Sequence, residues 1–283
     1  MLSFASICPH PPIIIPEIGG TQIKKCQKTI SAMKKLADYF NVAKPDTVIV
    51  ITPHGQIHSD EITILFPSPP LALPLPTGKR EGNLLYGNFY QFGHPEIKIQ
   101  LNNNSKLTDK IKSSADQDGI PTVLVKASEL DHGVLVPLYH LCQKITKLPK
   151  LIVITYSLLD IKTHFAFGQI IGKIIKTSPD KIAVIASGDL SHRLTPEAPA
   201  GYSPRGQEFD KKIISLLTNN NVSGILYLDA NLIEVAGECG LRSIIILLGV
   251  LSSFKYSPQI LSYEGPFGVG YGVVNFNLNQ RRM

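Results

Sequence analysis

Histidines that follow predicted strands are the residues of this chain best suited to do chemistry. His10, His54 and His192 each lie within five residues of the end of a short apolar segment rich in β-branched residues, such as 47–52. Ligands of open α/β sheets bind beyond the carboxyl ends of the strands, where these side chains would meet. A lone histidine is more often structural, but three of the eight histidines at equivalent strand ends indicate a functional cluster.

A metal ion is the ligand that such a cluster fits best. Two neutral imidazoles and one carboxylate on one face of a metal form the facial triad of non-haem Fe(II) oxygenases. His10 and His54 can supply the imidazoles. Glu238 stands out among the acidic residues near loops because glycines on either side, Gly237 and Gly240, let the backbone approach a site closely. The alternative for Glu238 is a solvated glutamate at a helix start, favoured by the helix dipole.

The elements that must position these residues alternate along the chain. Apolar residues at helical spacing occur over 21–40, 105–119, 134–145, 161–176, 208–218 and 243–251. Strand-like apolar segments occur over 2–7, 47–52, 62–66, 122–125, 151–156, 181–187, 259–263 and 269–276. This order predicts an α/β fold with a central mostly parallel or mixed sheet covered by helices on both faces. We expect a single domain over 1–283, with a Pro/Gly-rich excursion at about 67–93.

A fourth histidine, His132, lies in the connection that leads into the helix predicted at 134–145. Pro137 has no backbone N–H and is compatible with that helix only in its first turn. We therefore expect the helix to begin at about Val134, with Pro137 in its first turn and His132 in the connection before it.

Composition excludes several classes of protein. The longest stretch without charged residues, 62–78, is interrupted by five prolines, which argues against a membrane span. The N-terminus has no basic region typical of a signal peptide, and the four cysteines form no CxxC pair. The net charge is +6, but the lysine-rich face at 24–35 has no interleaved aromatic residues. We expect a cytoplasmic protein that binds neither nucleic acid nor membrane.

Five short motifs, in this order, resemble the class III extradiol ring-cleavage dioxygenases of the catalytic B-subunit type. The closest resemblance is to the uncharacterised branch of that family, which includes Memo-like proteins. The motifs span nearly the whole chain and are Pro9-His10-Pro11-Pro12, Pro53-His54-Gly55, Asp131-His132-Gly133, Ser187-Gly188-Asp189-Leu190-Ser191-His192 and Gly237-Glu238-Cys239-Gly240.

The resemblance implies a role for each histidine of the cluster. It implies that His10, His54 and Glu238 hold Fe(II), that His192 is the acid/base beside the metal, and that His132 positions or protonates the substrate. The implied activity is that of an extradiol dioxygenase-like oxidoreductase, which inserts O₂ into a small catecholic aromatic with ring cleavage next to the diol. The family also allows a homo-oligomer.

The Memo-like branch implies an alternative, a metal-binding protein without ring-cleaving activity, in a redox or interaction role. In that case Cys239 replaces or supplements the carboxylate, and a thiolate favours zinc or copper over Fe(II). Tyr202 and Arg205 are candidate contacts for a carboxylated or hydroxylated aromatic, because a guanidinium binds carboxylates in a bidentate way. Solvation of a loop is the equally compatible alternative for these two residues. A zinc hydrolase on the same architecture is a weaker third hypothesis.

Overall fold

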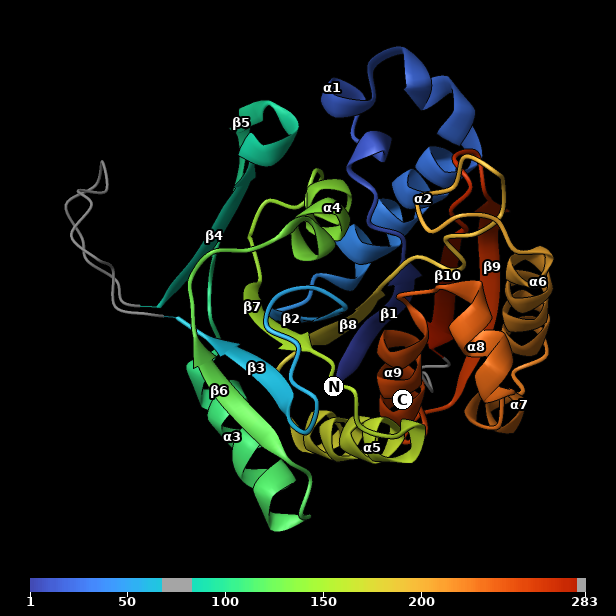
Figure 1. Ribbon diagram of the computed structural model, residues 1–283. Helices are drawn as coiled ribbons and strands as arrows, with labels where there is room; N and C mark the ends of the chain where they lie inside the picture. The colour runs from blue at the N-terminus through green and yellow to red at the C-terminus, as the bar shows by residue number, and fades with distance from the viewer. Residues whose placement is uncertain (68–82, 279–283) are drawn as a thin grey trace.

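The computed structural model describes residues 1–67 and 83–278. They form a single α/β domain around an eight-stranded sheet with the spatial order β6-β3-β7-β2-β8-β1-β10-β9 (Figure 1). The strands of this sheet are β1 (Leu2–Cys8), β2 (Thr47–Thr52), β3 (Ile62–Phe66), β6 (Thr122–Lys126), β7 (Lys150–Thr155), β8 (Ile182–Ser187), β9 (Tyr256–Glu264) and β10 (Tyr271–Leu278). The predicted fold class is confirmed.

The sheet is mixed, with a parallel centre. Strands β7, β2, β8 and β1 are parallel neighbours. Strand β3 is antiparallel to β7 at one side, while β10 and β9 add antiparallel strands at the other. Every residue of β2 is buried, because a parallel strand covered on both faces has no solvated side. The carboxyl ends of the four central strands therefore share one edge of the sheet.

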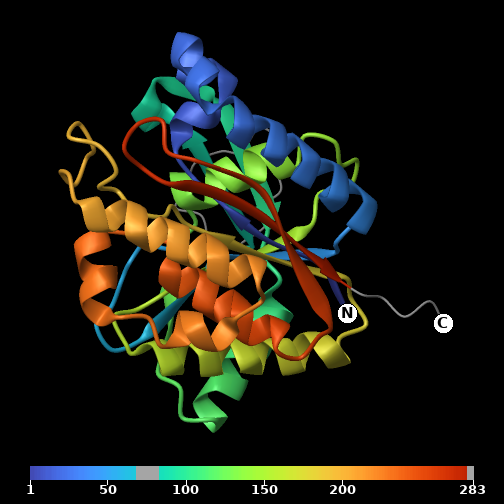
Figure 2. The same ribbon diagram turned by 90° about the vertical axis from the view of Figure 1, so that its right-hand side faces the viewer.

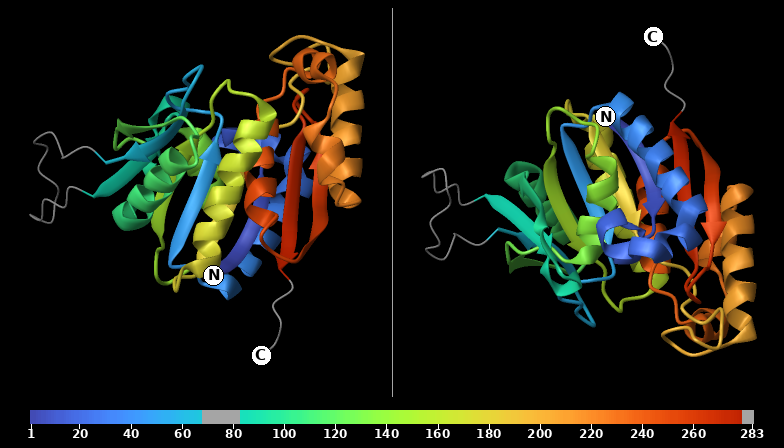
Figure 3. Two further views of the ribbon diagram at one scale, coloured as in Figure 1. Left: turned by 90° about the horizontal axis from the view of Figure 1, so that it is seen from below. Right: turned by 90° about the horizontal axis from the view of Figure 1, so that it is seen from above.

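Helices cover both faces of the sheet, as Figures 2 and 3 show from three directions. One face packs against α2 (Gln27–Ala43) and α4 (His132–Leu141). The other packs against α3 (Ser105–Gln117), α5 (Ile161–Thr177), α6 (Pro204–Thr218) and α9 (Leu241–Leu251). The shorter elements are η1 (Pro12–Ile14), α1 (Pro16–Gly19), η2 (Gly20–Cys26), η3 (Tyr90–Phe92), α7 (Val222–Leu226) and α8 (Ala230–Ala236).

The excursion predicted at about 67–93 lies only partly within the described residues, because 68–82 are outside them. The remainder of this Pro/Gly-rich segment contains regular structure. It forms β4 (Leu84–Phe89) and η3, and β4 pairs with β5 (His94–Asn102) in a separate two-stranded sheet (Figure 1). A glycine weakens an isolated strand, but Gly87 allows β4 to approach Leu130, whose carbonyl oxygen would lie 2.6 Å from an added Cβ. Tertiary packing thus decides this strand.

Helix α4 also differs from its prediction. It begins at His132 because the Asp131 side chain caps it, accepting a hydrogen bond from the amide of Gly133 at 2.7 Å. Pro137 is consequently the sixth residue of the helix and lies in its interior, so the prediction of a first-turn proline is wrong.

Two further observations concern the class of protein. No helix in the described part of the chain combines the length and the apolar character that a membrane span requires. All four cysteines are free thiols.

Candidate metal centre

The ends of β1 and β2 bring two of the predicted histidines together. His10 lies two residues beyond β1 and His54 two residues beyond β2. Their Nε2 atoms are 3.1 Å apart and their ring centroids 4.8 Å apart. The two imidazoles meet because both strands are parallel to β8 and end at the same edge of the sheet.

His132, the first residue of α4, completes a group of three histidines. Its ring centroid is 4.2 Å from that of His54 and 5.5 Å from that of His10. One ligand nitrogen from each ring lies within 4.8 Å of the others. A Cβ on the next residue, Gly133, would lie 2.7 Å from Cδ2 of His54 and 2.4 Å from Oγ1 of Thr52. The glycine therefore lets the helix start approach His54.

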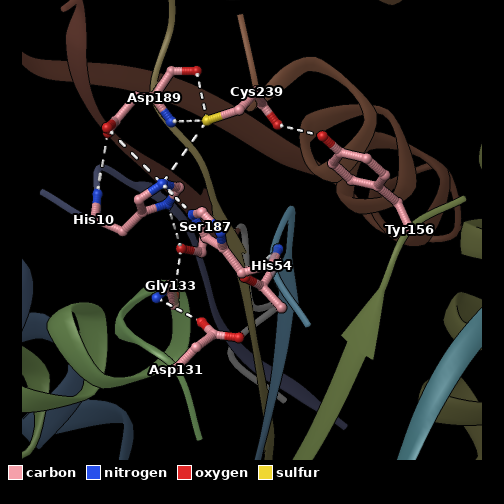
Figure 4. Close-up of polar contacts among 9 residues, drawn as sticks. His10, His54, Asp131, Gly133, Tyr156, Ser187, Asp189 and Cys239 are labelled. Atoms are coloured by element: carbon pink, nitrogen blue, oxygen red, sulfur yellow. Dashed lines mark hydrogen bonds and ion pairs between the residues drawn. The ribbon is translucent and has the colours of Figure 1, made fainter. Parts of the chain in front are cut away.

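Hydrogen bonds hold both strand-end histidines, and Figure 4 shows those of His10. The amide of His10 donates to Oδ1 of Asp189 at 3.1 Å, and its Nδ1 lies 3.1 Å from Oγ of Ser187. The amide of His54 donates to Oγ1 of Thr52, and its carbonyl oxygen accepts from Oγ1 of Thr155 at 2.7 Å. The Nε2 atoms of both rings are left to face each other.

The spacing of these nitrogens fits a shared metal ion. Two nitrogens that are each about 2.1 Å from one ion are about 3.0 Å apart at a right angle and about 3.4 Å apart at the tetrahedral angle. The observed separation of 3.1 Å between the Nε2 atoms of His10 and His54 lies in this range. The donor set, neutral imidazoles, suits iron, copper and zinc.

A sulfur atom lies beside this pair. Sγ of Cys239 is 3.8 Å from Nε2 of His10 and accepts a hydrogen bond from the amide of Asp189 at 3.3 Å (Figure 4). The carboxylate of Asp189 also comes within 3.8 Å of Nε2 of His10. The two loops touch at glycines, since a Cβ on Gly188 would lie 2.3 Å from Cα of Gly240. This close approach places Cys239 next to the histidines.

The carboxylate of Glu238 has a different partner. Its Oε2 accepts a hydrogen bond from the amide of Leu241, the first residue of α9, at 2.6 Å. Burial raises the pKa of Glu238 to about 7, although that hydrogen bond and the charge of Arg242 oppose the shift. Glu238 thus lies at a helix start, but its carboxylate is buried and not solvated, and its role as an iron ligand stays a prediction.

His192 lies near the same centre. It is half-buried, and its Nε2 is enclosed without a hydrogen-bond partner among the described residues. Burial lowers the pKa of His192, and the charge on His54 lowers it further. Because a positive charge on His54 disfavours one on His192, His192 belongs to the electrostatic surroundings of the cluster.

Burial favours the neutral form of each histidine in the cluster. Burial lowers the pKa of His10 well below its ordinary value, and repulsion from the neighbouring histidines lowers it further. Burial lowers the pKa of His54 against the opposing charge of Asp131. Burial and the charge on His54 lower the pKa of His132 to about 4. Neutral imidazoles retain the lone pairs that metal binding needs.

The two predicted substrate contacts are at least partly exposed to solvent. Tyr202 is 58% exposed. The guanidinium of Arg205 forms ion pairs with Glu208 and Asp229 and also donates to Oδ1 of Asn231. The contacts of Arg205 match the alternative in which these residues solvate a loop, and a role in substrate binding stays a prediction.

Sequence reasoning missed an aromatic wall and a cavity. Phe92 of η3 lies 5.7 Å from the ring of His132, edge to face. The only sequence signal for this contact is the presence of aromatic residues in the segment 67–93. A cavity of about 170 Å³ adjoins His54. Its lining comes from several separate strands and loops and includes Leu65, Val125, Ala127, Glu129, Leu130, Asp131, Val153 and Thr155.

Comparisons with known proteins agree with this architecture. The family described as the catalytic LigB subunit of aromatic ring-opening dioxygenase matches residues 4–274. Protein CA_C1420 of Clostridium acetobutylicum is 36% identical over 277 residues, which are 95% of this chain and 56% of that protein. The chain thus spans about half the length of this curated relative.

A solved structure shares the fold. The uncharacterised protein JW3007 of Escherichia coli K12 superposes with a TM-score of 0.59 at 14% identity, covering 96% of this chain and 98% of the other. Because the identity is low, this likeness shows the fold alone. The match to the family over residues 4–274 carries the assignment, and the chain belongs to the family of the catalytic LigB subunit of aromatic ring-opening dioxygenases.

Proposed function

We propose that this chain is a metal-dependent oxidoreductase of the extradiol dioxygenase type. Its substrates are O₂ and a small catecholic aromatic, and it cleaves the aromatic ring next to the diol. Its metal is Fe(II). The observation that carries the proposal is the convergence of His10, His54 and His132 at one edge of the sheet, in a chain that belongs to this family.

His10 and His54 would hold the metal. Their Nε2 atoms are already at the separation that a common ion requires, so little reorganisation accompanies binding. When bound, Fe(II) supplies the redox chemistry that lets dioxygen react with an aromatic diol. Cys239 and Asp189, both 3.8 Å from Nε2 of His10, are further possible donors beside this pair.

His192 and His132 would act on the substrate. The lowered pKa of His192 keeps its ring neutral, and its free Nε2 can take a proton from a catechol hydroxyl. The pKa of His132, about 4, leaves its ring uncharged near pH 7. His132 is therefore better suited to accept a hydrogen bond from a hydroxyl, which positions the substrate, than to protonate it. Phe92 adds an apolar aromatic surface beside His132.

One observation favours a second candidate function. The thiol of Cys239 lies beside His10, while the carboxylate of Glu238, the predicted third ligand, bonds to the amide of Leu241. A soft sulfur ligand favours zinc or copper over Fe(II). The second candidate is therefore a Memo-like metal-binding protein without ring-cleaving activity, in a redox or interaction role.

Oxygen consumption distinguishes the two candidates. Anaerobically purified protein, loaded with Fe(II) and checked for iron content, is mixed with a panel of catechols in an oxygen electrode. His192→Ala is the test variant, and His94→Ala is the matched control because His94 lies outside the cluster and pairs with Glu96. Uptake with a ring-opened product in wild type and His94→Ala, but not in His192→Ala, supports the dioxygenase. An iron-loaded wild type that consumes no oxygen with any diol supports the second candidate.

A further inference from the structure

Helix α4 contains a proline where a helix ordinarily needs a hydrogen-bond donor. In an α-helix the amide of residue 137 bonds to the carbonyl of residue 133. Pro137 has no N–H, and its ring crowds that same carbonyl. The carbonyl oxygen of Gly133 is thereby left without its partner in the helix ladder. A buried carbonyl of this kind must be satisfied by another donor.

Ser187 supplies the donor. It is the last residue of β8, is fully buried, and its Oγ donates to the carbonyl oxygen of Gly133 at 2.5 Å (Figure 4). A serine hydroxyl carries a single proton, and a carbonyl oxygen can only accept. The proton of Ser187 is therefore committed to Gly133. The same Oγ lies 3.1 Å from Nδ1 of His10, and toward that atom it can act only as an acceptor.

This proton count sets the tautomer of His10. Nδ1 must carry the hydrogen that Ser187 accepts, so Nε2 of the neutral ring holds a bare lone pair. That lone pair points at Nε2 of His54, 3.1 Å away. In the metal-free protein His54 then carries the hydrogen between the two rings. Metal-binding histidines commonly donate their other N–H to an outer partner that fixes the ring.

We propose that Ser187 and Pro137 are positioning residues of the metal centre. Pro137 frees the carbonyl of Gly133, that carbonyl takes the proton of Ser187, and Ser187 then holds His10 with Nε2 unprotonated toward the metal position. The inference rests on the proposed metal function but concerns residues outside the ligand set. It also explains why a proline stands inside α4.

Nitrogen NMR of metal-free protein with ¹⁵N-labelled histidine tests the tautomer directly. Protonated and bare ring nitrogens have distinct signals, and comparison with His10→Ala assigns those of His10. We expect the Nδ1–H form in wild type and a mixture of tautomers in Ser187→Ala. In Pro137→Ala a backbone N–H returns at residue 137 and competes for Gly133, so a mixture is expected there as well. A wild-type His10 protonated at Nε2 would overturn the proposal.

Zinc affinity, measured by competition with a chromogenic chelator, gives the second readout. Removal of an outer partner of a metal-binding histidine typically lowers affinity about 10- to 100-fold. We expect that loss in Ser187→Ala and a loss in the same direction in Pro137→Ala. Ser6→Ala is the matched control, because Ser6 is a buried serine on the adjacent strand whose Oγ contacts Cys8 and not His10. Circular dichroism checks that every variant is folded.

The outcomes separate the two proposals. Ser187→Ala binding zinc as tightly as Ser6→Ala overturns the role of Ser187, and wild-type affinity in Pro137→Ala overturns the role of the proline. The predicted tautomer in a wild-type protein that binds no metal supports the hydrogen-bond arrangement and overturns the metal centre itself.

Discussion

Replacing Gly133 with alanine sets two physical effects against each other. In an ordinary helix interior, alanine is more stable than glycine by roughly 0.5–1 kcal/mol. Here the new Cβ would lie 2.4 Å from Oγ1 of Thr52 and 2.7 Å from Cδ2 of His54, more than 0.5 Å inside ordinary contact. Overpacking of this kind costs about 1–3 kcal/mol. Thr52 cannot rotate away freely, because its Oγ1 accepts the amide of His54.

We therefore expect Gly133→Ala to lose roughly 1–2 kcal/mol of stability, since overpacking outweighs helix propensity. For a chain of this size that corresponds to a fall in Tm of about 2–6 °C. The displaced ring of His54 should also lower zinc affinity at least about tenfold. Differential scanning calorimetry and chelator competition measure the two effects, with the exposed helix position Ser113→Ala as the propensity control. A Gly133→Ala protein that is more stable than wild type and binds zinc equally well would refute the reasoning.

Three further predictions address the ligand set, the buried charges and the surface. Cys239→Ser should lower the affinity for copper and zinc about 10- to 100-fold. Glu238→Gln keeps an acceptor for the amide of Leu241 and should leave these affinities unchanged. Equal losses in both variants would support Glu238 as a metal ligand. Burial raises the pKa of Asp210 from 3.8 in the unfolded chain to about 7, so its contribution to stability is present at low pH and is lost as the pH rises through about 7. In Asp210→Asn, the free energy of unfolding, measured with urea on metal-free protein, should depend less on pH between pH 5 and 8. An unchanged dependence on pH would argue against a role of the buried Asp210 carboxyl. Arg205→Ala should leave the KM for a diol substrate unchanged, because its guanidinium pairs with surface groups, and a raised KM would support the predicted substrate contact.

Local patterns were sufficient for the fold class and for the location of the site. The continuous β-branched run at β2 could only be a strand buried on both faces, and it is buried at every position. Parallel strands end at a common edge, so two histidines placed just beyond β1 and β2 lie at the same edge, and they approach each other because only β8 separates the two strands. The number of residues between His10 and His54 does not affect this placement. The sequence could therefore predict that both histidines lie at this edge of the sheet.

Two elements were not predictable from apolar periodicity alone. Strand β4 contains Gly87, a poor strand residue that is favourable only because Leu130 packs against it. The start of α4 at His132 depends on the side chain of Asp131, which caps the helix two residues earlier than apolar periodicity indicated. In both cases a single tertiary or capping contact outweighs the local preference.

By itself, the sequence determined the α/β architecture, the resemblance to the family and the positions of His10 and His54 just beyond strand ends, because strand ends are encoded in local apolar patterns. The tertiary structure decided that only β8 separates β1 from β2. Only the tertiary structure decided whether Glu238 or Cys239 faces the histidines. Glu238 and Cys239 are adjacent in a turn that follows Gly237, whose φ is +60°, and spacing does not set side-chain directions outside regular elements. The backbone there directs the sulfur of Cys239 toward His10 and the carboxylate of Glu238 toward the amide of Leu241. The tertiary structure also decided the role of Pro137, because the Gly133 carbonyl that this proline leaves unpaired in α4 accepts a hydrogen bond from Ser187 of β8.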